Sequence, residues 1–162
     1  MAPRQGLCIL VLFRVRKARI VGLKERQGSE ILTALYAIAD GLFSDEAQPR
    51  LIGGRDRASG RIVFPCPDDD EYEAVPLGRD GTLWSWTVQR YRPKSPPYTG
   101  PEAFTPWIVA YIELPETIVE ARLVDIDPAD VSIGLPVTLT ATPLDPARPG
   151  ERLIPAFRPV TA

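Results

Sequence analysis

Alternating apolar and polar positions predict β-strands in the second half of the chain. Aromatic and β-branched residues are frequent in Thr82–Tyr91, and Trp107–Leu114 is apolar on both faces until Glu113. Between these segments lie five prolines and Gly100, which are incompatible with a helix or a regular ladder. We therefore expect two long strands joined by a proline-rich loop. Because that loop is long for a hairpin connection, we also expect it to be functional and to take part in partner docking.

Three further strands are predicted at even spacing, over Ile118–Asp125, Pro136–Thr142 and Leu153–Val160. Asp127 and Pro128 predict a short helical turn before the fourth of the five strands, with Asp127 as its cap. Five strands with such a turn match the five-stranded, partly open OB-fold barrel in number, although not in the detail of the helix position. The predicted fold class is therefore mainly β, with an OB-fold domain over residues 81–162.

The tryptophans are interpreted as core residues of this small barrel rather than as platforms for a ligand. Strict alternation places Trp84, Trp86 and Val88 on one face of their strand. Trp107 opens the next strand and is given the same core role.

The first half of the chain predicts three further units. Residues 1–28 form an extension, and its apolar run Leu7–Phe13 is too short for a membrane span or a secretory signal. A strand is the alternative for this run, and a poorly ordered extension is favoured. Residues 29–50 comprise a helix and a linker, since apolar residues follow helical spacing over Ser29–Leu42. Residues 51–80 are loop-rich, with turn signals at their glycines and a candidate short strand over Arg61–Phe64.

Composition narrows the function classes. The 162 residues carry a net charge of −2, so there is no overall basic field for nucleic acid or an anionic membrane. The chain contains no histidine, which excludes a Ser-His-Asp or Cys-His relay built from this chain alone. Two cysteines without paired spacing argue against a disulfide framework and favour the cytoplasm.

Several segments in order resemble the family of zinc-ribbon and OB-fold proteins catalogued as domain of unknown function thirty-five. The resemblance covers Leu51–Val160, and its order and spacing are more specific than any single segment. The segments that carry it are SGRIVFP (Ser59–Pro65), GTLWSWTVQRYRP (Gly81–Pro93), PWIVAYIEL (Pro106–Leu114), IGLPVTL (Ile133–Leu139) and PAFRP (Pro155–Pro159).

The family's zinc ribbon is degenerate in this chain. At the two positions of each Cys-x-x-Cys knuckle stand Asp56 with Ser59, and Asp70 with Glu73. Structural zinc prefers thiolate or imidazole ligands, whereas these oxygen donors suit calcium or magnesium better. We expect no metal, with the ribbon persisting as a hydrogen-bonded loop region. Cys66 lies outside both knuckles and is interpreted as an inert apolar residue.

A cationic and aromatic patch follows the first barrel strand and is the candidate for binding CoA phosphates or an acidic partner surface. The alternative is a solvated strand end with extended side chains. Aromatic residues of the proline-rich loop complete the predicted site. The candidate residues are Arg90, Tyr91, Arg92, Lys94, Tyr98 and Phe104.

The resemblance implies a non-catalytic accessory subunit in a hetero-oligomer. Its partner would be a thiolase-like or enoyl-CoA hydratase-like protein, which would supply the catalytic residues, and acyl-CoA would be the shared ligand. No cofactor, membrane or nucleic acid is expected. The first alternative is an OB-fold module that stacks its aromatic residues on nucleic-acid bases. The second is an enzyme that uses carboxylates alone, such as Asp56 with Asp70.

Overall fold

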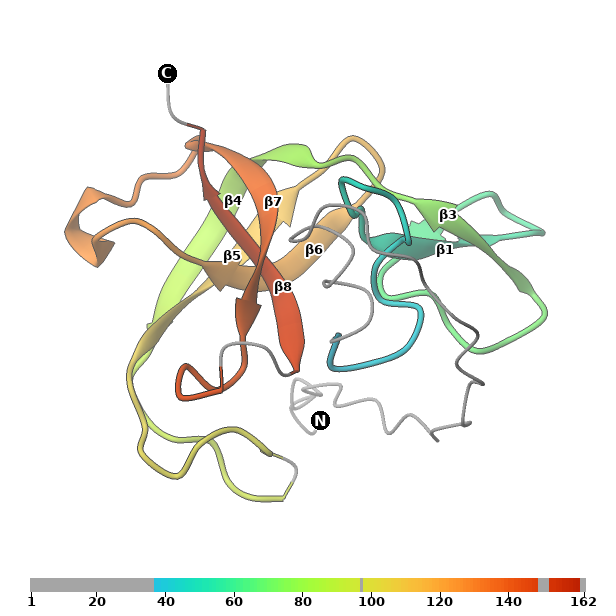
Figure 1. Cartoon of the computed structure of the whole chain (residues 1–162). Coiled ribbons are helices and arrows are strands. Elements are labelled where there is room, and N and C mark those ends of the chain that lie inside the picture. Colours follow the sequence, from blue (N-terminus) through green and yellow to red (C-terminus); the bar gives the residue numbers. More distant parts are fainter. Residues whose placement is uncertain (1–36, 97, 149–151, 161–162) are drawn as a thin grey trace, which may run out of the picture.

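The computed structural model describes residues 37–96, 98–148 and 152–160, which form a small sheet beside a β-barrel (Figure 1). The predicted extension over 1–28 and the predicted helical residues 29–36 lie outside the described residues. In the described part of the chain, no helix is long and apolar enough to cross a membrane.

The small sheet occupies the region predicted to be ribbon-like loop. Its strands are β1 (Ile52–Asp56), β2 (Ile62–Val63) and β3 (Tyr72–Pro76), in the order β2-β1-β3 with antiparallel pairing. β1 requires glycine at Gly53, where an added Cβ would lie 2.8 Å from the Leu77 side chain and 2.9 Å from the Val63 carbonyl oxygen. The prediction of a short strand near Ile62 is confirmed, whereas β3 was not predicted.

The barrel confirms the predicted mainly β fold and all five of its predicted strands. It is closed rather than partly open, in the order β4-β5-β6-β8-β7 with β7 returning to β4. Its one parallel pair joins β6 to β8. The short 3₁₀ helix η1 (Pro128–Asp130) lies between β6 and β7, and the Asp127 carboxylate caps it. The barrel strands are β4 (Asp80–Gln89), β5 (Trp107–Glu113), β6 (Ile118–Leu123), β7 (Pro136–Pro143) and β8 (Leu153–Pro159).

A β-bulge at Trp84 corrects the predicted faces of β4. Leu83 pairs with Ile112 and Ser85 with Tyr111, so Trp84 is an extra residue on the β4 side. A bulge re-aims side chains, and here it places both Leu83 and Trp86 against the core. The prediction that Trp84 and Trp86 share a core face is therefore wrong, because Trp84 is 54% exposed.

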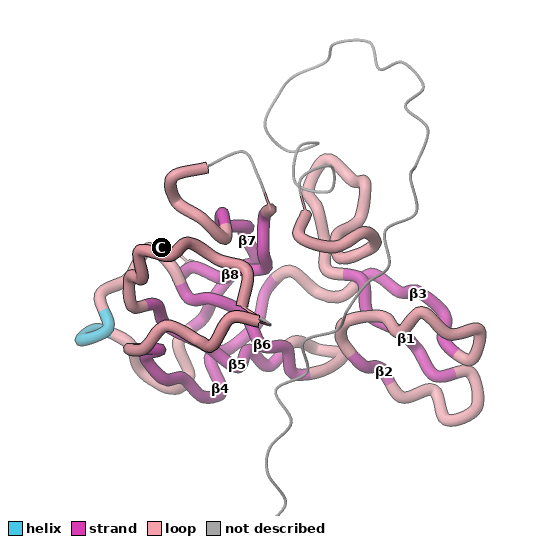
Figure 2. The backbone as a smooth tube through the Cα atoms, turned by 90° about the horizontal axis from the view of Figure 1, so that it is seen from below, coloured by secondary structure: helices cyan, strands magenta, loops and turns pink. Residues whose placement is uncertain are grey.

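The segment before β1 also differs from its prediction. Residues 37–42, the described end of the predicted helix, form a bridge, bends and a turn. Ala37 bridges Leu153 in parallel, and Phe43 bridges Leu51. Extended pairing prevails here because it buries Leu42 and Phe43 in a core shared with the barrel. Figure 2 shows this segment as loop beside the strands.

The sheet and the barrel share one hydrophobic core. Leu51 and Leu77 are fully buried and belong to the same cluster as the inward residues of β4 to β8. Arg79 reinforces the junction, since its guanidinium donates to the carbonyl oxygens of Pro49 and Leu139. The small sheet and the barrel therefore pack directly against each other.

Candidate functional site

The proline-rich loop between β4 and β5 packs against the barrel through Trp107. Tyr98 stacks on Trp107 with ring centroids 6.2 Å apart and planes 15° apart, and Phe104 is tilted against the same ring at 5.1 Å. The Arg122 guanidinium of β6 lies 4.5 Å from the Trp107 ring centroid. Burial lowers the pKa of Arg122 from its ordinary value, although an arginine retains its charge in a protein. The loop is thus anchored by aromatic and cation–π contacts.

Arg92 belongs to the same anchored cluster. Its guanidinium lies 5.3 Å from the Tyr98 ring centroid, and its Nε donates to the Pro101 carbonyl oxygen at 3.4 Å. Three of the six predicted site residues, Arg92, Tyr98 and Phe104, therefore make contacts within the loop and to the barrel.

The other three predicted residues, Arg90, Tyr91 and Lys94, are exposed, and Tyr91 retains 81% of its accessible surface. Since β4 ends at Gln89, Arg90 and Arg92 do not lie on a strand, and a spacing of two no longer sets a shared face. The structure therefore divides the predicted patch into an anchored half and an exposed half.

A second anchor joins this loop to the connection between β7 and β8. One guanidinium nitrogen of Arg152 donates to the Thr99 carbonyl oxygen at 3.0 Å, and the other donates to the Thr99 hydroxyl. Arg152 has a positive φ of 52°. This contact holds the two loops at a fixed separation, and a cleft lies between them.

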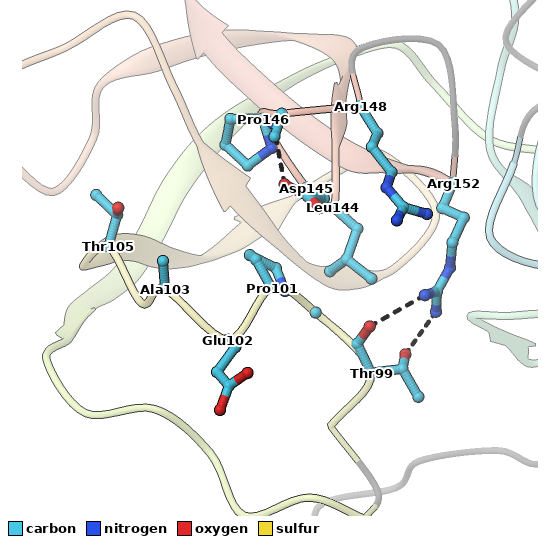
Figure 3. A pocket seen from close by; sticks show the side chains of 12 residues that line it. Thr99, Pro101, Glu102, Ala103, Thr105, Leu144, Asp145, Pro146, Arg148 and Arg152 are labelled. Carbon is cyan, nitrogen blue, oxygen red and sulfur yellow. Dashed lines mark hydrogen bonds between the residues drawn. The ribbon is translucent and has the colours of Figure 1, made fainter.

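The cleft has a volume of about 610 Å³ (Figure 3). Its apolar lining includes Pro101, Ala103 and Leu144. The guanidinium groups of Arg148 and Arg152 lie on one wall, whereas the Glu102 carboxylate points away from them (Figure 3). Asp145 also lines the cleft, but one of its carboxylate oxygens already accepts the Ala147 N–H at 2.9 Å.

These groups can bind an anionic ligand. Two guanidiniums offer planar donor sets for phosphate or carboxylate oxygens, beside an apolar surface for a ring or chain. The cleft also carries two carboxylates, those of Glu102 and Asp145.

Sequence reasoning missed several residues that build this region. Trp107 was predicted as core, whereas its ring anchors the proline-rich loop on the barrel. Arg122 gave no local signal, because its partner Trp107 comes from another strand. Arg148 and Arg152 lie in the connection between the last two strands. The signal that could have found both arginines was the topology. In an OB-fold, the connections that correspond to β4–β5 and β7–β8 here border the usual ligand site.

The former knuckle positions lie in strands and turns of the small sheet. Asp56 ends β1 and Glu73 lies in β3, whereas Ser59 and Asp70 lie in turns. One carboxylate oxygen of Asp56 accepts the N–H groups of Ala58 at 2.9 Å and Ser59 at 2.7 Å. The carbonyl of Asp70 accepts the Arg57 Nε at 3.1 Å. Over the described ranges, no group of three or more histidine, cysteine or acidic side chains is placed to hold a metal. These donors do not fit the structural zinc of a ribbon.

Cys66 is partly buried beside this sheet. Burial, followed by the negative charge of Asp68, raises the pKa of its thiol above 9.0. At neutral pH it is therefore a protonated, weakly reactive thiol.

The strand order and the two facing loops define an OB-fold protein with an N-terminal three-stranded sheet. Residues 74–142 match the family described as "ChsH2, C-terminal OB-fold domain". The fold is also similar to a solved chain described as "Ltp2-ChsH2(DUF35) aldolase", with a TM-score of 0.52. The two share 30% sequence identity, over 69% of this chain and 86% of that one. The chain therefore belongs to the ChsH2 family of DUF35-type OB-fold proteins, which confirms the resemblance seen in the sequence.

Proposed function

We propose that this protein is a non-catalytic accessory subunit of a thiolase-like or related acyl-CoA enzyme, and that it helps to bind acyl-CoA. The observation that carries this proposal is the relationship to the ChsH2 chain, whose described assembly is an Ltp2–ChsH2 aldolase. The absence of histidine from the whole sequence supports the accessory role, since a partner would then supply the acid–base chemistry.

The cleft is the proposed contact with acyl-CoA. Its arginine wall suits the phosphates, and its apolar lining suits the adenine ring or the pantetheine chain. Arg90 and Lys94 are exposed on the same proline-rich loop and would add a weaker, long-range attraction.

The nucleic-acid alternative is less well supported. An OB-fold that binds single strands uses open aromatic faces for base stacking. Here Tyr98 and Phe104 both pack against Trp107. Arg92 lies over the Tyr98 ring and Arg122 over the Trp107 ring. A net charge of −2 adds no general attraction for phosphate backbones.

Co-purification tests the proposal. The tagged full chain is recovered from its native host, and bound proteins are identified by mass spectrometry, with an unrelated tagged OB-fold protein as control. We expect a thiolase-like or enoyl-CoA hydratase-like protein in stoichiometric amount, whose turnover of acyl-CoA increases when the subunit is present. Turnover by the purified chain alone, or salt-sensitive binding of single strands without any such partner, would contradict the proposal.

A further inference from the structure

Large apolar side chains gather on the barrel surface away from the cleft. Seven large apolar residues are at least 40% exposed in the described part of the chain, and five of them lie in this region. In Figure 1 the loops that form the cleft are at the bottom of the barrel, and the C-terminus leaves from the top. The five residues are Trp84 (54% exposed), Tyr111 (40%), Ile118 (42%), Ile133 (72%) and Val160 (52%), and we call them the apolar end.

Strand register places these residues at one end of the barrel. Ile118 pairs with Glu113, Glu113 with Thr82, and Thr82 with Pro136. The Val160 N–H then donates to the Pro136 carbonyl oxygen. Because the barrel is closed, this row runs around its circumference, and Ile118 and Val160 lie in it with polar positions between them.

Trp84 and Ile133 lie beside this row. Trp84 is the bulged residue between Leu83 and Ser85, and Ser85 pairs with Tyr111. The N–H of Gly134 donates to the Leu83 carbonyl oxygen at 2.8 Å, which brings the adjacent Ile133 next to the bulge.

The centre of the apolar end is held in one geometry. The Trp84 and Tyr111 rings pack edge to face, with centroids 6.5 Å apart and planes 81° apart. The Tyr111 hydroxyl donates to the Glu120 carboxylate at 2.8 Å. A bulge that turns a tryptophan outward onto a fixed tyrosine displays a large apolar surface at little conformational cost. Aromatic side chains that become buried when two proteins bind often contribute most of the binding energy of the interface.

The charges around the apolar end are mainly negative. Asp80 and Asp130 are exposed near the apolar end, Glu113 and Glu120 are exposed between its residues, and Arg158 is an exposed cation on the neighbouring row. A second copy of this chain would place acidic rim against acidic rim, which is unfavourable for a two-fold interface.

We propose that the apolar end is the docking surface for the enzyme partner, and that the partner presents an apolar centre rimmed by lysine or arginine. This inference rests on the proposed function, and it adds the surface through which the subunit would bind its enzyme partner. The accessory subunit then meets its enzyme through the outer face of β4 and β5, and the cleft stays open for the ligand.

Affinity measurements with matched variants test this proposal. Trp84→Ser and Ile133→Ser remove apolar surface from the apolar end, and Ile38→Ser removes an apolar side chain that is 41% exposed elsewhere. The dissociation constant is measured against the purified thiolase-like partner at low and high salt, after circular dichroism has established the fold of each variant. We expect about tenfold or more weakening for Trp84→Ser, a similar direction for Ile133→Ser, and no change for Ile38→Ser. The wild-type association rate should fall as salt rises.

Hydrogen exchange of the wild-type complex gives a second readout that needs no variant. We expect protection of residues 80–86, 109–113 and 131–136 on partner binding. Unchanged affinity in both variants, or protection confined to the cleft loops, would overturn the docking surface and leave the proposed function standing. Self-association of the wild-type chain that the two variants abolish would replace the partner with a second copy. Failure of the wild-type chain to bind any such enzyme would instead overturn the proposed function, and the docking surface with it.

Discussion

Asp56 stabilises the β1–β2 turn through its charged form. The N–H groups of Ser59 and Ala58 bond to its carboxylate, with Ser59 the main cause, and they lower its pKa below 3.8. A carboxyl group whose pKa is lowered by folding adds stability above the unfolded pKa and loses it as pH falls through the folded pKa. We therefore expect Asp56→Ala to lower the melting temperature at pH 7. This difference from the wild type should shrink below pH 3.8 and vanish at lower pH.

Asp70→Ala is the control, because Asp70 contributes its backbone carbonyl rather than its carboxylate to the described contacts. Thermal melts across pH 2 to 7 make the comparison. An equal loss of melting temperature at pH 2 and pH 7 would show that the Asp56 charge plays no part.

At the scale of an element, Arg122 is expected to fix the proline-rich loop. Arg122→Met retains a long, unbranched side chain at this position but removes the cation that lies over Trp107. We expect a loss of about 0.5–2 kcal/mol in loop anchoring and faster chymotryptic cleavage at Tyr98 and Phe104. Arg90→Met is the matched control, since Arg90 is exposed at the start of the same loop. Equal cleavage rates in the two variants would exclude an anchoring role.

The cleft arginines and the exposed loop cations are expected to differ in their effect on CoA binding. Arg148→Ala should weaken binding of CoA about tenfold or more, because charged hydrogen bonds contribute roughly 1.5–3 kcal/mol. The double change of Arg90 and Lys94 to alanine should cost about 1 kcal/mol or less, since exposed charges are well screened. Calorimetric titration with CoA in the presence of the partner measures both. A larger effect from the exposed pair would relocate the phosphate site to the loop surface.

The strands were predictable from the sequence where one face is buried and the other is not. Residues 136–142 alternate cleanly, and β7 forms there. β3 escaped prediction because it is short and its residues are mostly exposed, so it carries no clear alternation. The bulge at Trp84 could not be predicted from the neighbouring sequence, because its position depends on the register between β4 and β5.

Long-range contacts also explain why the predicted helix does not form over residues 37–42 and why the contacts of the loop residues could not be predicted. The residues near Leu42 carry helical spacing, yet in the described part they are buried through pairing with Leu51 and Leu153. The composition of the proline-rich loop marked it as functional. The division of its residues between anchor and exposed surface depends on Trp107, Arg122 and Arg152, which come from other elements.

At the scale of the whole molecule, we expect the purified protein to carry no stoichiometric zinc. Hydrogen bonds and a shared core hold the small sheet together, and the former knuckle positions supply no thiolate. Elemental analysis of protein purified without chelator measures this directly. About one zinc per chain would contradict the expectation, and removal of that zinc would then have to unfold the small sheet.

The shared core also predicts where the chain can be shortened. A chain that begins at Ser29 keeps every described contact, so it should unfold as cooperatively as the full chain. A chain that begins at Ser44 lacks Leu42 and Phe43, which are buried in the common core. Loss of two such side chains should cost several kcal/mol, by analogy with about 2–5 kcal/mol for a single large-to-small change. Thermal melts of the two truncated chains test this prediction. Equal melting temperatures would contradict a core that includes Leu42 and Phe43.

Closure of the barrel has a consequence for how the protein is made. β4 is completed by β7, more than fifty residues later, and β6 gains its parallel neighbour only when β8 is present. During synthesis the β4–β6 meander is therefore translated with its inner face uncovered, and it stays so until the last strand leaves the ribosome. Such a chain completes its folding after translation and depends on long-range pairing, which folds slowly. A nascent chain arrested before Leu153 should therefore bind chaperones that recognise exposed apolar strands, and release from them should coincide with the appearance of β8.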